Sequence, residues 1–307
     1  MTDPTLLDRS RVPGRLERAW RNQLFVLPAV LVVAATTLYP LFYNLQLSTY
    51  DAPLTKFLRG EITGVGLGNY ADQLADPVMW RALGTSLIYT TATIVLMLVG
   101  GTALALFFNR RFPGRNLLRA ALFLPYVLPS VVAANVWRWL LDGTFGLFNH
   151  LLATLHLIDE PVFWLGRPGT ALVAVIIATG WTMIPFAMLL LVAGLQSVPP
   201  EVLEAAELDG AGPARRFFSI TAPHLLPVAL VVALLGFIYT FKTFDTIFIM
   251  TKGGPGDATT TLPILAYNSA FVNFDLGQGA ALNTLLLVIP VVLALLYFRA
   301  VGREELS

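Results

Sequence analysis

Six long stretches of this 307-residue chain contain no aspartate, glutamate, lysine or arginine. A run of about 18 or more such residues is long enough to cross a lipid bilayer as a helix. Inside a bilayer the backbone must satisfy its own hydrogen bonds, which a single apolar segment does only as a helix. The sequence therefore predicts an all-α, polytopic membrane protein with six transmembrane helices at 23–50, 82–109, 120–137, 168–200, 217–241 and 276–298.

The composition supports this class and narrows the chemistry. Charged residues make up 13% of the chain and the mean hydropathy is +0.70, whereas soluble domains carry about 25% charged residues. The first apolar stretch is much longer than the apolar region of a cleaved signal peptide, and five more stretches follow it. There is no cysteine, which excludes disulfides and thiolate metal sites.

The distribution of basic residues predicts the orientation. If the N-terminus is cytoplasmic, the inner segments hold thirteen of the twenty basic residues and the outer segments hold seven. The short loop 110–119 alone has four arginines, the kind of loop to which the positive-inside rule applies best. We therefore expect a cytoplasmic segment at 1–22, an extracytoplasmic loop at 51–81, a cytoplasmic loop at 201–216 and a cytoplasmic tail at 299–307.

The sequence lacks the residues that several other classes of function need. The predicted spans contain no carboxylate, whereas ion-coupled transporters commonly place an ionisable group near the membrane midplane. No Walker A, HExxH or GxSxG motif occurs, and the three histidines have no companions at metal-ligand spacing. We expect no catalytic residue, metal site or cofactor in this chain, and no nucleic-acid partner. Energy for transport would then come from another polypeptide.

One short polar segment, EVLEAAELDGAGPARRFF at 201–218, interrupts the apolar pattern. Prolines suit the first turn of a helix that begins near residue 200, and Glu201 and Glu204 favour its positive end. Gly210 and Gly212 end that helix, and Pro213 begins a second one. The segment predicts a short helix–turn–helix on the cytoplasmic membrane surface, joined to transmembrane helices on both sides.

This segment resembles the signature loop of permease subunits of binding-protein-dependent ABC importers. The matching positions share a fixed spacing, and one departure is Ala222, where the family usually has leucine. The resemblance implies that the segment couples this chain to an ATPase, with Glu204 paired to a basic residue there. The residues assigned to coupling are Glu204, Ala205, Ala206, Asp209, Gly210, Ile220 and Pro223.

Three further stretches, 66–83, 122–149 and 244–262, resemble the carbohydrate or maltose-type branch of that family. The resemblance covers residues 66–298 and implies a type I importer permease fold, with a permease core at 82–298 that contains five of the helices. It implies four kinds of partner: a second homologous permease, two ATP-binding cassette subunits that bind ATP, an external solute-binding protein and membrane lipid.

The solute path is expected around the proline-bent fourth span and the end of the fifth. Pro185 interrupts ATGWTMIPFAM at 178–188, and aromatic faces and hydroxyls suit an uncharged polyol. Aromatic residues near span ends also form interfacial belts, and Lys242 with Asp245 also suits an i,i+3 ion pair. The resemblance implies the first three path residues and their types suggest the others: Thr179, Met183 and Phe186, then Tyr239, Thr240, Thr243, Gln278 and Asn283.

The sequence thus predicts the permease subunit of an ATP-driven importer that moves a sugar or sugar-like solute inward across the cell membrane. Two alternatives stay open. In the first, the solute is a phosphorylated polyol such as glycerol 3-phosphate, whose phosphate would meet Lys242. In the second, the chain is a secondary transporter, against which both the missing intramembrane carboxylates and the ATPase-docking loop count.

Overall fold

The computed structural model describes residues 26–304. The expected cytoplasmic segment 1–22 and the last three residues of the tail lie outside the described residues. Within that range five helices are long and apolar enough to cross a membrane, and a bent pair of helices makes a sixth if it is counted as one span. The five are Val26–Leu47, Pro77–Asn109, Pro168–Leu195, Pro213–Phe241 and Leu276–Arg299.

The third predicted span, 120–137, is not one continuous helix in the structure. The structure divides it into α6 (Arg115–Val127) and α7 (Ser130–Leu140), whose axes differ by 96°. Leu128, with ψ of 138°, is extended at the break. Pro129 explains this conformation, because a proline disfavours the helical region for the residue before it and offers no amide hydrogen. A proline bend was expected in this span, and the structure adds that the bend amounts to 96°.

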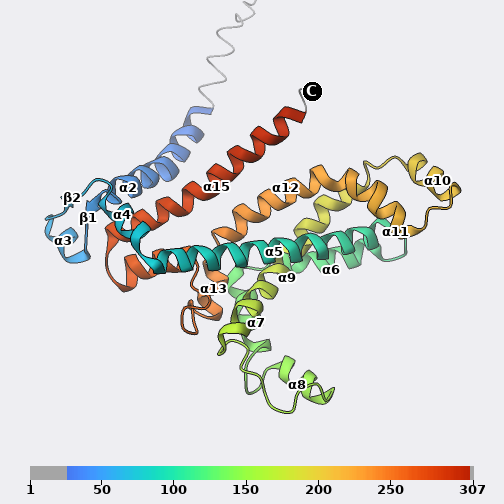
Figure 1. The fold of residues 1–307 in the computed structure, drawn as a ribbon, viewed down its shortest axis with the longest axis horizontal. Helices are drawn as coiled ribbons and strands as arrows, with labels where there is room; N and C mark the ends of the chain where they lie inside the picture. The colour runs from blue at the N-terminus through green and yellow to red at the C-terminus, as the bar shows by residue number, and fades with distance from the viewer. Residues whose placement is uncertain (1–25, 305–307) are drawn as a thin grey trace, which may run out of the picture.

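Three long helices form the centre of the molecule (Figure 1). They are α5 (Pro77–Asn109), α9 (Pro168–Leu195) and α12 (Ala222–Phe241), the last preceded by the π-helical turn η2 (Phe217–Thr221). The α5 helix begins five residues earlier than the predicted span, since Pro77 occupies its first position and the Asp76 carboxylate accepts from the Val78 amide at 2.8 Å. A polar cap therefore extends this helix beyond its apolar run.

Small residues let these helices approach closely. A Cβ on Gly101 of α5 would lie 2.7 Å from the Cβ of Ala187 on α9, and one on Gly236 of α12 would lie 2.5 Å from the terminal methyl of Met97. Contacts of this kind replace the hydrophobic driving force that lipid does not provide. Around them lies a buried cluster that includes Met97, Phe108 and Met188.

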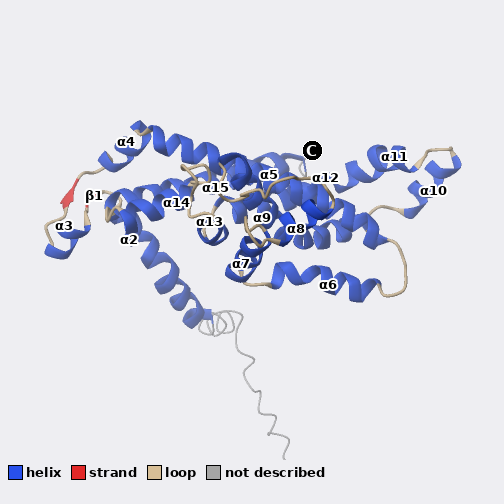
Figure 2. Cartoon of the chain, turned by 90° about the horizontal axis from the view of Figure 1, so that it is seen from below, coloured by secondary structure: helices blue, strands red, loops and turns tan. Residues whose placement is uncertain are grey.

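At one end of the molecule, two short helices join α9 to η2 (Figures 1 and 2). They are α10 (Pro200–Leu208) and α11 (Pro213–Arg216). Between them Gly210 has a φ of +79°, a conformation that glycine adopts without steric cost. The predicted helix–turn–helix is confirmed, and we call residues 201–216 the coupling segment.

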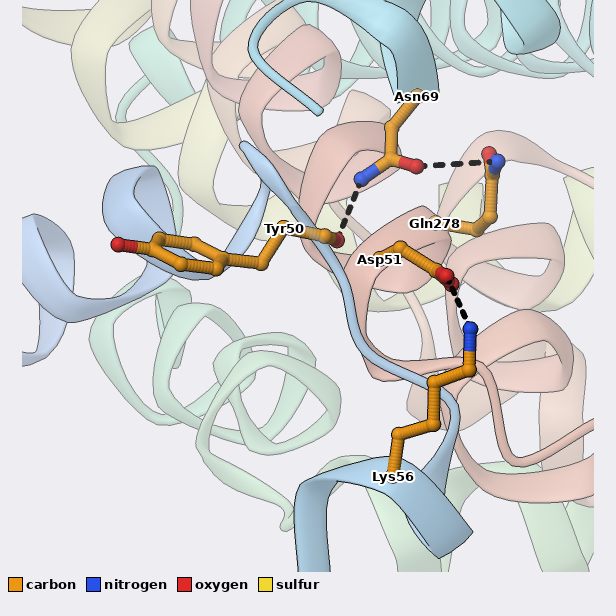
Figure 3. Close-up of polar contacts among 5 residues, drawn as sticks. All are labelled: Tyr50, Asp51, Lys56, Asn69 and Gln278. Carbon is orange, nitrogen blue, oxygen red and sulfur yellow. Dashed lines mark hydrogen bonds and ion pairs between the residues drawn. The ribbon is translucent and has the colours of Figure 1, made fainter. Parts of the chain in front are cut away.

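The opposite end, which we call the hairpin end, carries a small two-stranded sheet. Strand β1 (Tyr50–Asp51) pairs antiparallel with β2 (Thr63–Gly64), and α3 (Leu54–Arg59) and α4 (Gly68–Ala75) flank the pair. Lys56 forms an ion pair with Asp51 within this end (Figure 3). The hairpin connects the first span, which includes the π-helical turn η1 (Ala34–Leu38) and α2 (Tyr39–Leu47), to α5.

Hydrogen bonds tie the hairpin end to the last long helix, α15 (Leu276–Glu304) (Figure 3). The amide of Asn69 donates to the carbonyls of Ser48 and Tyr50, both at 2.9 Å. Gln278 of α15 donates to the Asn69 side chain at 3.3 Å and accepts from Gln73 at 2.7 Å. Two chain segments more than two hundred residues apart are thereby held together.

A lobe of shorter helices lies against the middle of the bundle (Figure 1). The short helix α14 (Leu262–Tyr267) and the π-helical turn η3 (Asn268–Val272) pack against α15. The lobe contains α7, α8 (Leu147–Thr154) and α13 (Asp245–Met250). Within it the side chain of Asn149 bonds the backbone of the loop before α9. Nearby, hydrogen bonds from Thr144 hold the pKa of Asp142 below its usual range.

Candidate functional site

The break between α6 and α7 opens onto a cavity of about 420 Å³, which we call the central cavity. Five elements contribute to its wall: α6, α7, α9, the end of α12 and α13. The lining residues are Tyr126, Leu128, Ser130, Thr179, Thr182, Met183, Tyr239, Lys242, Thr243, Phe244, Asp245 and Thr246.

Four of the eight expected path residues line this cavity. Thr179 and Met183 come from α9 and precede Pro185 by less than two helical turns. Tyr239 comes from the end of α12, and Thr243 comes from the loop that follows it. Residues about sixty positions apart in the sequence are therefore brought to one space. The lining also includes two charged groups, Lys242 and Asp245, that sequence reasoning had considered there.

A fifth expected residue, Phe186, supports the cavity wall without lining it. Its ring stacks on Tyr126 with centroids 5.5 Å apart, and meets Tyr239 edge to face at 6.3 Å. Both geometries are favourable for aromatic pairs. Phe186 thus holds in place the rings of Tyr126 on α6 and Tyr239 on α12, both of which line the cavity.

Hydroxyl groups in the wall are held in place by the surrounding helices. The Tyr89 hydroxyl of α5 donates to Thr179 Oγ1 at 2.8 Å, and Thr182 Oγ1 donates to the Thr179 carbonyl at 2.7 Å. The hydroxyl proton of Thr179 takes no part in either bond. A buried hydroxyl oriented in this way can donate to an acceptor in the cavity.

The charged groups of the wall have partners other than each other. Lys242 places its ammonium 5.4 Å from the ring centroid of Tyr239, which is within cation–π range. The Asp245 carboxylate accepts from Ser130 Oγ at 2.9 Å. Among the described residues the two ion pairs lie elsewhere, so the i,i+3 pair considered for Lys242 and Asp245 is absent from this part of the chain.

Three expected path residues lie away from the cavity. Thr240 is fully buried and its hydroxyl donates to the Gly236 carbonyl of its own helix at 2.8 Å. Gln278 belongs to the hydrogen-bonded group at the hairpin end (Figure 3), because its amide is the partner of Asn69 and Gln73. Asn283 is exposed on α15 and does not line the cavity.

Sequence reasoning missed most of the contribution of α6 and α7 to the wall. Tyr126, Leu128 and Ser130 reach the cavity because the chain turns sharply at Pro129. The signal was the Leu-Pro pair in the middle of an apolar run, since a proline there ends one helix and redirects the next.

The residues expected to couple this chain to an ATPase lie in the coupling segment and, for Ile220 and Pro223, in η2 and α12 directly after it. Glu204, Ala205, Asp209, Gly210 and Pro223 are exposed, and Ala206 and Ile220 are half-buried. At the tip the side chain of Leu208 is 89% exposed. A large apolar side chain flanked by carboxylates is a surface that another protein can cover.

An ion pair joins the two helices of the coupling segment. Arg216 Nη1 of α11 lies 2.5 Å from Glu207 Oε2 of α10. The turn also carries two backbone bonds, from the Gly210 amide to the Glu207 carbonyl and from the Ala211 amide to the Ala206 carbonyl. Sequence analysis did not single out this pair, which becomes visible only when the turn sets the positions of the helices.

A membrane bundle whose bent helices line a cavity with hydroxyl and aromatic groups, with a paired helical projection at one end, has the architecture of a transport permease. The chain belongs to the family of binding-protein-dependent transport system inner membrane components, whose family model matches residues 97–303. The resemblance found in the sequence is thereby confirmed. The match runs from the middle of α5 almost to the end of α15 and includes the coupling segment.

Several characterised permeases are similar over most of their length. The trehalose/maltose transport system permease protein MalF of Thermococcus litoralis is 36% identical over 281 residues, which cover 91% of this chain and 92% of that protein. The sulfoquinovosyl glycerol transport system permease protein SmoG of Agrobacterium fabrum is 32% identical, covering 92% and 90%. The sn-glycerol-3-phosphate transport system permease protein UgpA of Yersinia pestis is 33% identical, covering 93% and 95%.

The fold has a solved counterpart. A bacterial ABC transporter involved in the import of the acidic polysaccharide alginate contains a chain that matches with a TM-score of 0.78, at 18% identity, over 94% of this chain and 97% of its own. The fold is therefore that of a type I importer permease. The chain is a multi-pass inner-membrane permease subunit of an ABC importer.

Proposed function

We propose that this chain forms one side of the path by which an ATP-driven importer moves a sugar or sugar-like solute into the cell. The relatives support the solute class, because two of them are named as permeases of transport systems for trehalose or maltose and for sulfoquinovosyl glycerol. The observation that carries the proposal is the convergence of Thr179, Met183, Tyr239 and Thr243 on the central cavity.

The chemistry of the cavity suits a polyol. Tyr126 and Tyr239 present aromatic faces that can stack on the C–H surfaces of a sugar ring, and threonine hydroxyls can replace water at its hydroxyl groups. A solute held by several neutral contacts of this kind is bound weakly at any one of them. Weak, distributed contacts favour passage over retention.

The coupling segment is the proposed seat of the ATPase. Two ATP-binding cassette subunits would bind below a pair of permeases, and Glu204 would meet a basic residue in an ATPase groove, so this chain itself needs no cofactor. Glu204, Ala205 and Asp209 are exposed for such a contact. The segment is joined to α9 on one side and to η2 and α12 on the other, and both long helices contribute to the central cavity.

The remaining partners follow from the orientation that the arginines favour. The end with the coupling segment would face the cytoplasm together with both termini, and the hairpin end would face outward, where a solute-binding protein delivers solute. A complex of a bacterial alginate importer with a solute-bound periplasmic protein has been solved for the similar chain. A second, homologous permease would form the other side of the path.

Import of a phosphorylated polyol is the second candidate, and Lys242 favours it. Its ammonium lies at the wall of the central cavity and has no carboxylate within 4.0 Å among the described residues. A compact cation in that position suits a phosphate. The similar UgpA belongs to an sn-glycerol-3-phosphate transport system.

Uptake by the complete importer, reconstituted with its solute-binding protein, tests both candidates. Tyr239→Ala should lower uptake of the transported sugar by about two- to tenfold, as expected for loss of an aromatic contact of roughly 0.5–1.5 kcal/mol. Asn283→Ala is the control, because Asn283 lies outside the cavity.

The second candidate is tested with maltose, trehalose and glycerol 3-phosphate as transported probes. Lys242→Gln should lower the uptake of glycerol 3-phosphate and leave the uptake of the two sugars unchanged. Unchanged uptake by Tyr239→Ala would contradict the path, and uptake driven by a proton gradient without ATP would favour the secondary transporter.

A further inference from the structure

A second cavity, which we call the arginine cavity, lies between the end of α5 and the start of α6. Its volume is about 330 Å³, and it is lined by Arg111, Phe112, Gly114, Arg115, Asn116 and Leu117. Both views place this connection at the same end of the molecule as α10 and α11 (Figures 1 and 2). It is therefore remote from the hairpin end.

The charge of this region is strongly positive and locally uncompensated. Arg110, Arg111, Arg115 and Arg119 fall within ten residues, and no aspartate or glutamate occurs between Asp76 and Asp142. The two ion pairs in the described part of the chain involve none of these arginines. These positive charges would favour the binding of an anion in the cavity.

The four arginines differ in what they already do. Arg119 donates to the Phe108 carbonyl at 3.1 Å and lies over the Phe108 ring, so it braces α6 against α5. Arg115 makes only a long contact, 3.5 Å, with the Arg110 carbonyl. Arg111 and Arg115 are the two that line the cavity, and they are the ones free to bind a ligand there.

An apolar track leads away from the cavity along α6. Leu117 lines the cavity and is 78% exposed, and Leu124 is 62% exposed. Together with the exposed Ala121 these residues follow a spacing of four and three, which places them on one face of the helix. A ligand whose charged group occupies the cavity could lay an apolar chain along this face.

We propose that the arginine cavity binds the phosphate headgroup of an anionic phospholipid, whose acyl chain follows Leu117 and Leu124. The family is one of inner membrane components, and Leu117 and Leu124 on α6 are exposed in this chain. An acyl chain of the surrounding lipid is therefore the occupant that suits this apolar face. The proposed orientation puts the cavity at the cytoplasmic surface, where basic pockets recognise anionic headgroups. The ligand needs both a charged headgroup and an apolar chain, because the arginine cavity and the apolar track along α6 form one continuous surface.

Lipid retention by the intact importer tests this inference. The complex is stripped of lipid in detergent and mixed with equal amounts of phosphatidylglycerol and phosphatidylcholine of the same acyl chains. Bound lipid is then measured by native mass spectrometry. The wild-type complex should prefer phosphatidylglycerol by on the order of tenfold, the scale expected for two cations at an anionic headgroup. Arg111→Gln with Arg115→Gln should abolish the preference.

Three variants make the result specific. Arg111→Lys with Arg115→Lys keeps the charge and should keep most of the preference. Leu117→Gln keeps both arginines and should reduce retention through loss of the apolar track. Arg59→Gln with Arg167→Gln removes the same charge from exposed positions outside the cavity and should leave the preference unchanged.

Three outcomes would overturn the inference. The first is equal preference in the wild type and in the glutamine double variant. The second is displacement of the lipid by inorganic phosphate with no effect of Leu117→Gln, which would indicate a soluble anion. The third is loss of a partner subunit from the glutamine double variant but not from the lysine one, which would indicate a protein contact. Solute uptake is not read in this assay, so a failure of the proposed transport function remains a separate result.

Discussion

At the scale of single residues, Gly210 and Glu204 have separate roles in the same short segment. Gly210 has a φ of +79° and no atom within 4 Å of where a Cβ would lie. The constraint on that position is therefore the backbone conformation and not the space around it. Glu204 is exposed and lies one helical turn before the end of α10. One residue sets the shape of the coupling segment and the other offers it a charge.

Substitution of these two residues should impair coupling without unfolding the spans. Glu204→Ala should remove the proposed charge-assisted contact with the ATPase, which would contribute about 1.5–3 kcal/mol. Gly210→Val should be at least as harmful, because a β-branched residue is strongly disfavoured at positive φ. Solute uptake and ATPase association in membranes measure the effect at equal expression. Wild-type transport by both variants would mean that this segment is not the coupling element.

The ion pair between Glu207 and Arg216 gives a second test at this scale. Reversal of one charge, by Glu207→Arg or Arg216→Glu, should place like charges between α10 and α11 and lower solute-dependent ATPase activity several-fold. The double exchange restores opposite charges and should recover most of the activity. The exposed carboxylate limits the energy of the pair to about 1 kcal/mol or less. A double exchange as impaired as the single ones would argue against the pairing.

At the scale of elements, α5 and α9 make the most extensive helix–helix contact in the described residues, and glycines lie within it. At Gly101 the nearest atoms to an added Cβ belong to Ala187 and to the backbone of Met188, at 2.7 and 3.2 Å. Backbone atoms cannot move aside as a flexible side chain can. Gly84, in the same helix, has no atom within 4 Å of an added Cβ.

The two glycines form a matched pair for mutation. Gly101→Ala should destabilise the protein by about 1–3 kcal/mol through overpacking. Gly84→Ala should be neutral or slightly stabilising, since alanine favours a helix more than glycine does. Thermal unfolding of the purified importer in detergent compares the two. Equal stability of both variants would show that the helices can separate at Gly101 without cost.

Most elements were predictable because apolar runs and prolines act locally. The two helices of the coupling segment and five long spans were found at nearly their observed positions. The angle between α6 and α7 was not, since a proline indicates a break but its direction depends on packing. The site divides in the same way. Thr179 was identified from the family resemblance and Tyr239 from its residue type at the end of a span, whereas Gln278 has partners about two hundred residues away that no local pattern reveals.

At the scale of the whole molecule, the central cavity is open on the side that this chain does not cover. Its wall comes from five elements of one chain, and the exposed aromatic faces of Tyr126 and Tyr239 form part of it. A path needs to be enclosed on all sides to exclude other solutes. The missing wall is the proposed contribution of a second permease.

The purified complex should therefore contain two different permeases. This chain should co-purify with a homologous permease subunit in a one-to-one ratio, because it has no internal repeat that could supply the second wall. Native mass spectrometry of the affinity-purified complex gives the ratio directly. A stable homodimer that transports solute without such a partner would contradict the expectation.

Energy conversion should be absent from the isolated chain. Purified alone it should neither bind nor hydrolyse ATP, since its sequence has no phosphate-binding loop. Hydrolysis should appear when the cassette subunits are added. The measurement is phosphate release, with a cassette subunit disabled in its Walker A lysine as the control. Activity of the pure permease that survives that control would refute the assignment.

The bonds at the hairpin end also determine how the first helix can move. No residue in the apolar window of Val26–Leu47 is buried within this chain. The side-chain bonds of Asn44 and Ser48, to Thr284 and Tyr70, all lie at the hairpin end of that helix. Within the described residues it is a cantilever, clamped over residues 39–48 by α15 and the hairpin end, with no buried residue between Val26 and Leu38. Its displacement should grow with distance from the clamp, so that lipid or a neighbouring subunit can bend it with little force while its root stays still.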